Sequence, residues 1–229
     1  MRALSAKDLL SVWESGASQV PLQRALTMLA FACPEASSDS LARLTIGQRD
    51  ARLLALREMT FGFEVTGVTD CPECGEKIEL SLNCSQIRST TEAEPPDELV
   101  VQANGFEMRF RLPTSADLFA VKTEEELLER CLLSRVDDLT EDFAATVSEK
   151  MASADPMAEI HLVLDCPRCQ HRWEAPFDIV AFLWREISAA ARRLLREVHT
   201  LASAYGWTET EILALSPARR RIYLEIVNG

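Results

Sequence analysis

The chain has 229 residues, of which 47% are hydrophobic and 26% charged, and its formal net charge is −12. This composition is typical of a globular protein with its own core, and no run of about 18 apolar residues predicts a membrane-spanning helix. Residues 90–159 hold 17 acidic and 6 basic side chains, so one central segment carries nearly all of the excess negative charge. Because a phosphate backbone requires a basic face, this charge argues against nucleic acid as a partner.

Residues 1–62 are expected to form an N-terminal helical segment. Capping residues and apolar spacing predict three helices, at residues 5–15, 21–33 and 45–61. Residues 35–44, rich in serine and alanine, are expected to be a polar connection. The charged residues of the third helix are expected to form a solvated side, and they are Arg49, Asp50, Arg52, Arg57 and Glu58.

Residues 63–89 are predicted to form a β-hairpin around the tetrapeptide Cys71-Pro-Glu-Cys74. Apolar and polar residues alternate on both sides of it, as they do in half-buried strands. In a C-P-x-C tetrapeptide the proline fixes its own φ angle and the turn places both sulfurs on one side, where backbone N–H groups can face them. The tetrapeptide is therefore predicted to be half of a metal site.

Residues 90–159 are expected to form an acidic α+β insertion that begins with a proline-containing link, residues 90–98. After the link, strands are predicted at 99–101 and 106–112. A helix is expected to begin near 113–117, and two further helices are predicted at 124–134 and 139–153. Asn104-Gly105 between the strands is typical of a type I′ hairpin turn. Val136-Asp-Asp-Leu139 is expected to separate the last two helices.

Residues 160–177 repeat the hairpin pattern around a second tetrapeptide, Cys166-Pro-Arg-Cys169, which lies 95 residues after the first. Aspartate precedes both tetrapeptides and glutamate follows both at the same offset. A compact zinc ribbon separates its two turns by about 15–20 residues, whereas 91 residues separate these two. A folded segment is therefore expected between the halves of a split ribbon.

Four thiolates from two such turns are the donor set that tetrahedral Zn²⁺ prefers. The predicted ligands of one structural Zn²⁺ per chain are Cys71, Cys74, Cys166 and Cys169. Redox activity is less favoured, because a thioredoxin-like C-x-x-C occurs once and in a βαβ pattern that is missing here. Structural disulfides are also less favoured, since three cysteines remain and no secretion signal is recognisable, which favours a reducing cytoplasm. The remaining cysteines are expected to be buried small hydrophobes, and they are Cys33, Cys84 and Cys131.

Residues 178–229 are predicted to be C-terminal helices. Asp178 is expected to cap a long helix that reaches about Tyr205, and two short capped helices follow Gly206. The solvated face of the long helix is expected to carry Arg192, Arg193 and Arg196. Aromatic side chains often anchor protein interfaces, and the candidate anchors for a partner protein are Tyr205, Trp207 and Tyr223. The alternative for Trp207 is that it packs beneath the last helix.

The expected fold class is α+β and mostly helical, with a split zinc ribbon on two β-hairpins and an inserted acidic α+β segment. The five segments are expected to form one compact domain. The histidines are scattered without a nucleophile near them, and no glycine-rich phosphate loop is present. The sequence therefore predicts a protein that is not an enzyme.

Two blocks of the sequence carry a resemblance to a known family. The first runs from Leu44-Thr-Ile-Gly-Gln-Arg-Asp50 to Gly62 and into the first tetrapeptide. The second runs from Leu195-Arg-Glu197 through Ala204-Tyr205-Gly206-Trp207 to Tyr223-Leu224. The phrase Leu112-Pro113-Thr-Ser-Ala-Asp117 agrees with them. In these blocks the chain resembles the T-even-type phage baseplate hub assembly chaperone family of contractile tails and injection systems.

The resemblance implies a cytoplasmic, non-enzymatic factor of the bacterial cell that binds hub and spike proteins during particle assembly. It implies nothing about a metal, so the zinc prediction depends on the cysteine spacing alone. The acidic insertion is a candidate for screening a basic surface of an unassembled hub protein. Two alternatives are a permanent zinc-stapled structural component of the baseplate and, less favoured by the charge, a zinc-ribbon protein that binds nucleic acid.

Overall fold

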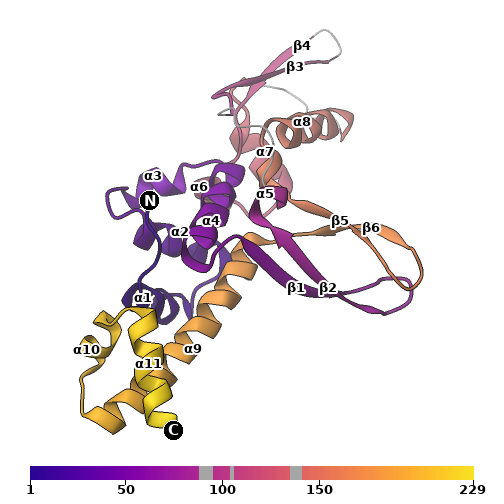
Figure 1. The fold of residues 1–229 in the computed structure, drawn as a ribbon. Helices are drawn as coiled ribbons and strands as arrows, with labels where there is room; N and C mark the ends of the chain where they lie inside the picture. Colours follow the sequence, from indigo (N-terminus) through magenta and orange to yellow (C-terminus); the bar gives the residue numbers. More distant parts are fainter. Residues whose placement is uncertain (88–94, 104–105, 135–140) are drawn as a thin grey trace.

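The structure is a computed structural model that describes residues 1–87, 95–103, 106–134 and 141–229 (Figure 1). In these residues helices predominate and the strands form separate antiparallel pairs, which confirms the predicted α+β class. In chain order the elements are α1 (Ala6–Gly16), α2 (Pro21–Ala32), α3 (Ser38–Ala42), α4 (Ile46–Phe61), β1 (Glu64–Asp70), β2 (Lys77–Asn83), α5 (Cys84–Ile87), β3 (Leu99–Ala103), β4 (Phe106–Phe110), α6 (Ser115–Ala120), α7 (Glu124–Cys131), α8 (Glu141–Ala154), the 3-10 turn η1 (Pro156–Ala158), β5 (His161–Asp165), β6 (Arg172–Pro176), α9 (Ile179–Tyr205), α10 (Glu209–Ala214) and α11 (Pro217–Asn228).

Helices α1, α2, α4 and α9 pack against one another and form the helical body of the protein. Its fully buried side chains include Val12, Met28, Leu53, Leu183 and Ile187. Helices α1 and α4 each begin with a capping box, in which a hydroxyl and a side chain three residues later bond reciprocally to the backbone. These local signals are strong, and all three helices predicted in the N-terminal segment are confirmed to within a residue.

Two expectations for the N-terminal segment were wrong. Residues 35–44 contain a short helix, α3, because Ser37 caps it and Leu41 is buried. The charged side of α4 is only partly solvated, since three of its charged residues are buried, namely Arg49, Asp50 and Arg57. Their burial is tolerated because they are paired. The Arg49 and Asp50 side chains are 2.7 Å apart, and Arg57 lies 2.7 Å from Glu186 of α9.

Two β-hairpins project side by side from the helical body, and their turns meet at the far end (Figure 1). The first pairs β1 with β2 in the register Glu64↔Asn83 to Asp70↔Lys77, and the second pairs β5 with β6 in the register His161↔Pro176 to Asp165↔Arg172. Each is a strand, a C-P-x-C turn and a strand, as predicted. The prediction did not include the short helix α5, which follows β2 directly and buries Cys84.

The insertion between the hairpins has a small hydrophobic core of its own, made of Leu99, Val101, Met108, Phe110, Leu112 and Val147. It joins the helical body at the first turn of α4. There the Ile46 N–H donates to the Pro113 carbonyl at 3.2 Å, and the Gly47 N–H donates to Asp155 Oδ2 at 2.9 Å. A Cβ at Gly47 would lie 2.0 Å from Asp155 Oδ1, so only glycine permits this approach.

The strands and helices predicted for the insertion are present, but α7 ends at Cys131, earlier than the predicted residue 134. The helix stops because the following backbone pairs with β4. Leu132 forms a β-bridge with Phe110, and the Leu133 N–H donates to the Arg109 carbonyl at 2.8 Å. Three predicted features lie outside the described residues: the Asn104-Gly105 turn, the separator at 136–139 and residues 90–94 of the acidic link.

Helix α9 runs for 27 residues from the base of the hairpins to the C-terminal helices, and α10 and α11 fold back against it (Figure 1). Gly206 ends it with a left-handed φ of 70°. The three arginines expected on its solvated face are exposed. Arg220 of α11 is buried and donates to Glu197 of α9 at 2.9 Å. None of the helices within the described ranges combines the length and the apolar character needed to cross a membrane.

Candidate metal centre

The two C-P-x-C turns share one backbone geometry. In each, the N–H of the first cysteine donates to the carbonyl five residues later, and the carbonyl of the first cysteine accepts from the N–H four residues later. Written from the N–H donor to the carbonyl acceptor, these bonds are Cys71 to Glu76, Gly75 to Cys71, Cys166 to His171 and Gln170 to Cys166, all at 2.9 Å. The repeated sequence motif therefore corresponds to a repeated local structure.

The residue after the second cysteine is left-handed in both turns, with a φ of 67° at Gly75 and 61° at Gln170. This region costs a residue with a Cβ about 1–2 kcal/mol. Gln170 is the one non-glycine residue with a positive φ in the part of the chain that the structure describes. Because glycine and glutamine adopt the same angle, the turn itself must require it. Such a turn points successive N–H groups at a shared anion.

The turns bring the four predicted ligands together. The sulfurs of Cys71 and Cys169 are 3.7 Å apart, and those of Cys74 and Cys166 are 3.6 Å apart. All four sulfurs lie within 4.8 Å of one another. Tetrahedral bonds of about 2.3 Å to a central ion would separate the sulfurs by about 3.8 Å. A disulfide would require about 2.05 Å, and all seven cysteines are free.

The surroundings hold the two turns against each other. Cys71 and Cys166 are buried, while Cys169 is exposed at the tip. Ile78, Leu80 and Trp173 pack beside the sulfurs. Outside this apolar cluster, an ion pair of 3.1 Å joins Glu76 of the first turn to Arg168 of the second. The ion pair is exposed, so it contributes little stability by itself and a bound ion would hold the tips together far more strongly.

Backbone N–H groups favour the thiolate form in this cluster. Those of Cys169 and Arg168 bond to the Cys166 sulfur and lower the pKa of this thiol to about 7. The N–H of His171 also lowers the pKa of Cys169, but desolvation and the neighbouring sulfurs outweigh it and raise the pKa of Cys169 to about 12. Because like charges this close oppose one another, four ionised sulfurs require a cation among them.

The donor set fits a tetrahedral metal ion that accepts four thiolates, which is the preference of Zn²⁺ and of iron. Protein sulfur would fill every position of such an ion, so no position would remain open for a substrate. His171 stacks on Trp173 with their ring centroids 5.9 Å apart and does not belong to the sulfur cluster. The arrangement can therefore join two hairpins that are far apart in the sequence.

The other three cysteines lie apart from the cluster. Cys84 and Cys131 are completely buried, as expected, and Cys33 is half-buried. Burial raises the pKa of Cys131 to about 11, so this thiol stays protonated at neutral pH.

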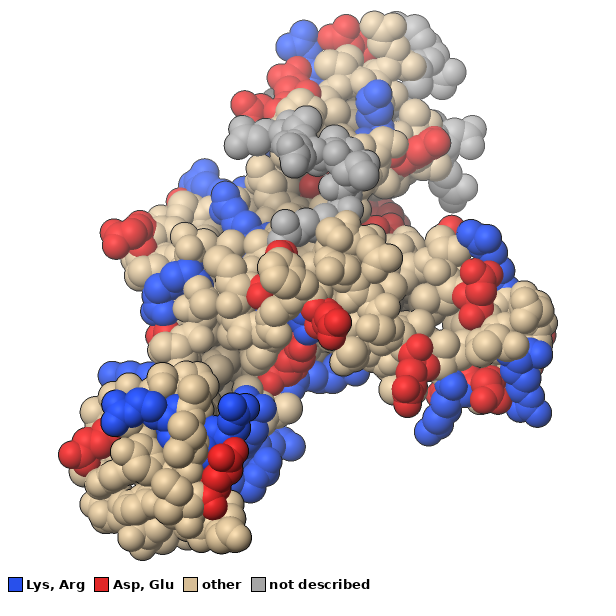
Figure 2. Space-filling view, viewed as in Figure 1, with Lys and Arg blue, Asp and Glu red and all other residues tan. Residues whose placement is uncertain are grey.

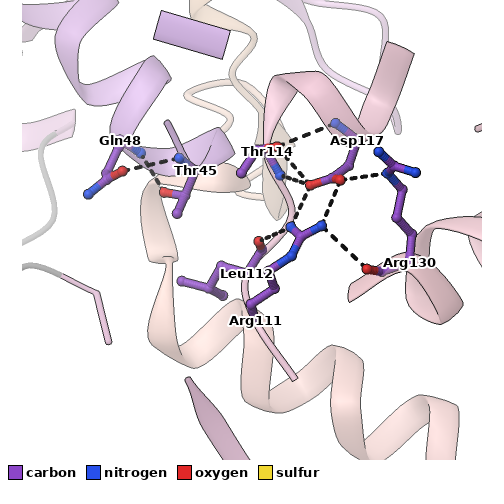
Figure 3. A network of polar contacts seen from close by, with 7 residues as sticks. All are labelled: Thr45, Gln48, Arg111, Leu112, Thr114, Asp117 and Arg130. Atoms are coloured by element: carbon purple, nitrogen blue, oxygen red, sulfur yellow. Dashed lines mark hydrogen bonds and ion pairs between the residues drawn. The ribbon is translucent and has the colours of Figure 1, made fainter. Parts of the chain in front are cut away.

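A buried carboxylate, Asp117, organises the junction between the insertion and the helical body (Figure 3). Its side chain is 3% exposed and accepts from Arg111 at 2.6 Å, from the Thr114 hydroxyl at 2.7 Å and from Arg130 at 2.8 Å. Desolvation raises the pKa of Asp117, but these donors outweigh it and hold the pKa well below its usual range. Thr114 also forms a β-bridge with Thr45, the cap of α4.

The candidate anchors at the C-terminal end also lie together. The rings of Tyr205 and Trp207 stack with centroids 4.6 Å apart, and Tyr223 of α11 meets Trp207 edge-on at 4.9 Å. Trp207 is half-buried and Tyr205 is 37% exposed. Trp207 thus packs against the last helix and is still partly exposed to solvent. The arrangement is compatible both with packing beneath the last helix and with a role as an anchor for a partner.

Arg57, which was expected on the solvated side of its helix, is buried and joins α4 to α9. Its guanidinium donates to both carboxylate oxygens of Glu186, at 2.7 and 2.9 Å, and to the Gly62 carbonyl at 2.7 Å. The contact with Gly62 fixes the point where β1 leaves the helical body. The pKa of Arg57 is raised, chiefly by its hydrogen bonds to Glu186. The one signal in the sequence for the burial of Arg57 is the mixture of apolar and charged residues along α4.

A comparison with protein-family models matches residues 5–184 to the family described as T4 bacteriophage base plate protein. The match spans more than three quarters of the chain and includes both hairpins and the insertion. Of the two sequence blocks that carry the resemblance, the one beginning at Leu195 lies beyond the matched range. Comparisons with curated proteins and with solved structures gave no match.

Proposed function

The chain belongs to the T4 bacteriophage base plate protein family, and from this premise we propose that it is a non-enzymatic assembly chaperone of the baseplate hub. It would bind hub and spike proteins of a contractile phage tail or injection system in the bacterial cytoplasm, before they enter the particle. The family match supports its place in the baseplate, and the closed cluster of four sulfurs supports a structural metal, because such a cluster leaves no open position on the ion for a substrate.

Zinc is the proposed ion, one per chain, with Cys71, Cys74, Cys166 and Cys169 as its ligands. Two C-x-x-C turns with four thiolates are the usual donor set of structural zinc ribbons. Zn²⁺ has no geometric preference of its own and no redox chemistry, so it fits a purely structural role. Its role would be to hold the two hairpins in the side-by-side arrangement of Figure 1.

Two surfaces are candidates for contact with hub proteins. The aromatic cluster of Tyr205, Trp207 and Tyr223 is partly exposed, and aromatic rings of this kind often anchor interfaces. The insertion carries most of the excess negative charge, whereas Figure 2 shows Lys and Arg side chains gathered around the C-terminal helices. An acidic insertion would attract a basic surface of an unassembled hub protein, and the attraction would weaken as salt increases.

A second candidate function is that of a permanent baseplate component, with the metal cluster stabilising its fold. The family description favours it, since that description names a base plate protein without mentioning an assembly role. The two functions predict different residence times, because a chaperone leaves its partner when assembly is complete and a component stays.

Quantitative mass spectrometry of finished particles and of assembly intermediates distinguishes the two functions. The chaperone proposal predicts that the chain co-purifies with hub or spike proteins from cells in which later assembly is blocked. It also predicts that the chain is absent from finished particles. A fixed stoichiometric amount in finished particles would contradict the chaperone role and support a permanent component.

A further inference from the structure

The two hairpins enclose a groove with an apolar lining. The inner face of the first hairpin carries Val65 and Gly67 of β1 opposite Leu82 and Leu80 of β2. The inner face of the second carries Leu162 and Leu164 of β5, and α9 closes one side. The volume of the groove is about 460 Å³, which lies within the range of about 300–1,000 Å³ for binding pockets. The faces of the two hairpins therefore leave space between them.

Gly67 lies in the middle of β1, and nothing within the described structure requires a glycine there. Its φ is not positive, and a Cβ added to it would meet no atom within 4 Å. Glycine inside a strand is unfavourable for folding, and it often marks a place where another backbone approaches closely. The space in front of Gly67 opens into the groove. The missing side chain therefore leaves room there for a segment of another molecule.

The groove runs along β1, which has one free edge among the described strands. All five residues from Val65 to Thr69 line it, although successive side chains of a strand point to opposite faces. β2 lines the groove only with the alternate residues Leu80 and Leu82, so the groove lies on the β1 side of this hairpin. In the described residues β1 pairs with β2 alone, so its second edge offers unpaired N–H and C=O groups. Five strand residues extend over about 17 Å.

The charge on the groove indicates the chemistry of the occupant. Of its two charged lining residues, Glu186 already accepts two hydrogen bonds from Arg57. Arg185 has no carboxylate partner among the described residues, and its guanidinium lies 5.7 Å from the centre of the Phe182 ring. The unneutralised charge of the groove is thus positive, which complements a carboxylate of the occupant.

We propose that the groove binds an extended segment of a baseplate partner protein, which adds a strand to the free edge of β1. Backbone hydrogen bonds would give affinity, as they do in other cases of strand addition. The segment carries apolar residues at alternate positions, one of which fills the space before Gly67, and an Asp or Glu that pairs with Arg185. This inference rests on the proposed function, because it specifies how the hub or spike partner is held.

The test uses the full zinc-loaded chain and overlapping synthetic peptides that cover the hub and spike proteins. Peptides that bind are expected to share alternating apolar residues and an acidic residue. The variant Gly67→Val fills the groove and should weaken their binding by about tenfold or more, with the zinc content unchanged and the melting temperature equal or higher. The matched control is Ser81→Val, which adds the same side chain to the outer face of the same hairpin and should bind like wild type.

A charge exchange tests the second part of the proposal. Arg185→Glu should weaken binding of the acidic peptide and restore binding of a peptide with lysine in place of the carboxylate. Equal binding by wild type and Gly67→Val, or no peptide bound by wild type, would overturn the groove proposal. Self-association that is lost in Gly67→Val would also overturn it, since the occupant would then be a second copy.

The intact hub complex separates this proposal from the proposed function. If both wild type and Gly67→Val form the complex equally well, the groove is wrong and the chaperone proposal stands. If wild type forms no complex with any hub or spike protein and binds none of their peptides, both proposals fail.

Discussion

Asp117 shows how a single side chain can join two parts of the protein. It is buried, yet it stays ionised because Arg111, Arg130 and the Thr114 hydroxyl all donate to it. Arg111 follows β4, Arg130 belongs to α7, and Thr114 forms a β-bridge with Thr45 at the start of α4. Removing the charge would leave the two arginines without their anionic partner at the junction shown in Figure 3.

The replacement Asp117→Asn is expected to destabilise the protein by about 2 kcal/mol at pH 7, because hydrogen bonds to charged groups contribute about 1.5–3 kcal/mol each and the arginines are partly exposed. The folded-state pKa of Asp117 is lowered, so its stabilisation is present above the unfolded pKa of about 3.9 and is lost as pH falls from there towards the folded pKa. Urea unfolding of both proteins from pH 7 to pH 3 measures this.

The difference in unfolding free energy between wild type and Asp117→Asn should therefore shrink below about pH 4. A difference that stays constant over this range would show that the carboxylate charge does not stabilise the junction. Arg2→Gln is the variant for comparison. It removes the arginine partner of Asp8, whose carboxyl also has a lowered pKa, at a site far from the insertion.

At the scale of the element, the C-P-x-C turns act as paired units. Their sequences specify their structure locally, because proline, cysteine and the left-handed residue all lie within five positions. The sulfur cluster packs with its own small apolar group, separate from the core of the helical body. Loss of the metal is therefore expected to release the hairpins first and to leave the helical body folded at the start.

Cys74→Ser and Cys166→Ser should lose zinc and make the hairpins, residues 64–83 and 161–176, sensitive to protease. Structural zinc contributes about 10–16 kcal/mol of binding free energy, which few small apolar contacts could replace. Cys33→Ser is the matched control, because Cys33 is half-buried and remote from the cluster, and it should keep its zinc. Metal analysis and limited proteolysis measure both effects, and equal behaviour of the three variants would refute the ligand assignment.

Most of the elements follow from short local patterns in the sequence. The capped helices, the two hairpins and the four clustered cysteines were predictable, because each depends on a local pattern of a few residues. Helix α7 was predicted too long, since its end depends on a β-bridge between Leu132 and Phe110 that no local pattern announces. Helix α3 was missed, because a single buried leucine supplies most of its apolar contact.

Across the whole molecule, the features that the sequence did not predict depend on contacts between segments far apart in the chain. The burial of Arg57 depends on Glu186, which lies 129 residues later in the chain. The groove exists because two hairpins from different parts of the chain stand side by side, and no local sequence pattern predicted it. The charge pattern was readable from the sequence, but the contact of the acidic insertion with the first turn of α4 was not.

One measurement tests both the zinc-held pair of hairpins and the binding of hub proteins. Native mass spectrometry of the chain co-expressed with hub and spike proteins reads the bound metal and the partner together. We expect one zinc per chain in a complex with a hub or spike subunit, and chelation should release both the metal and the partner. A chain that carries no zinc, or that binds no subunit while fully loaded with zinc, would contradict this expectation.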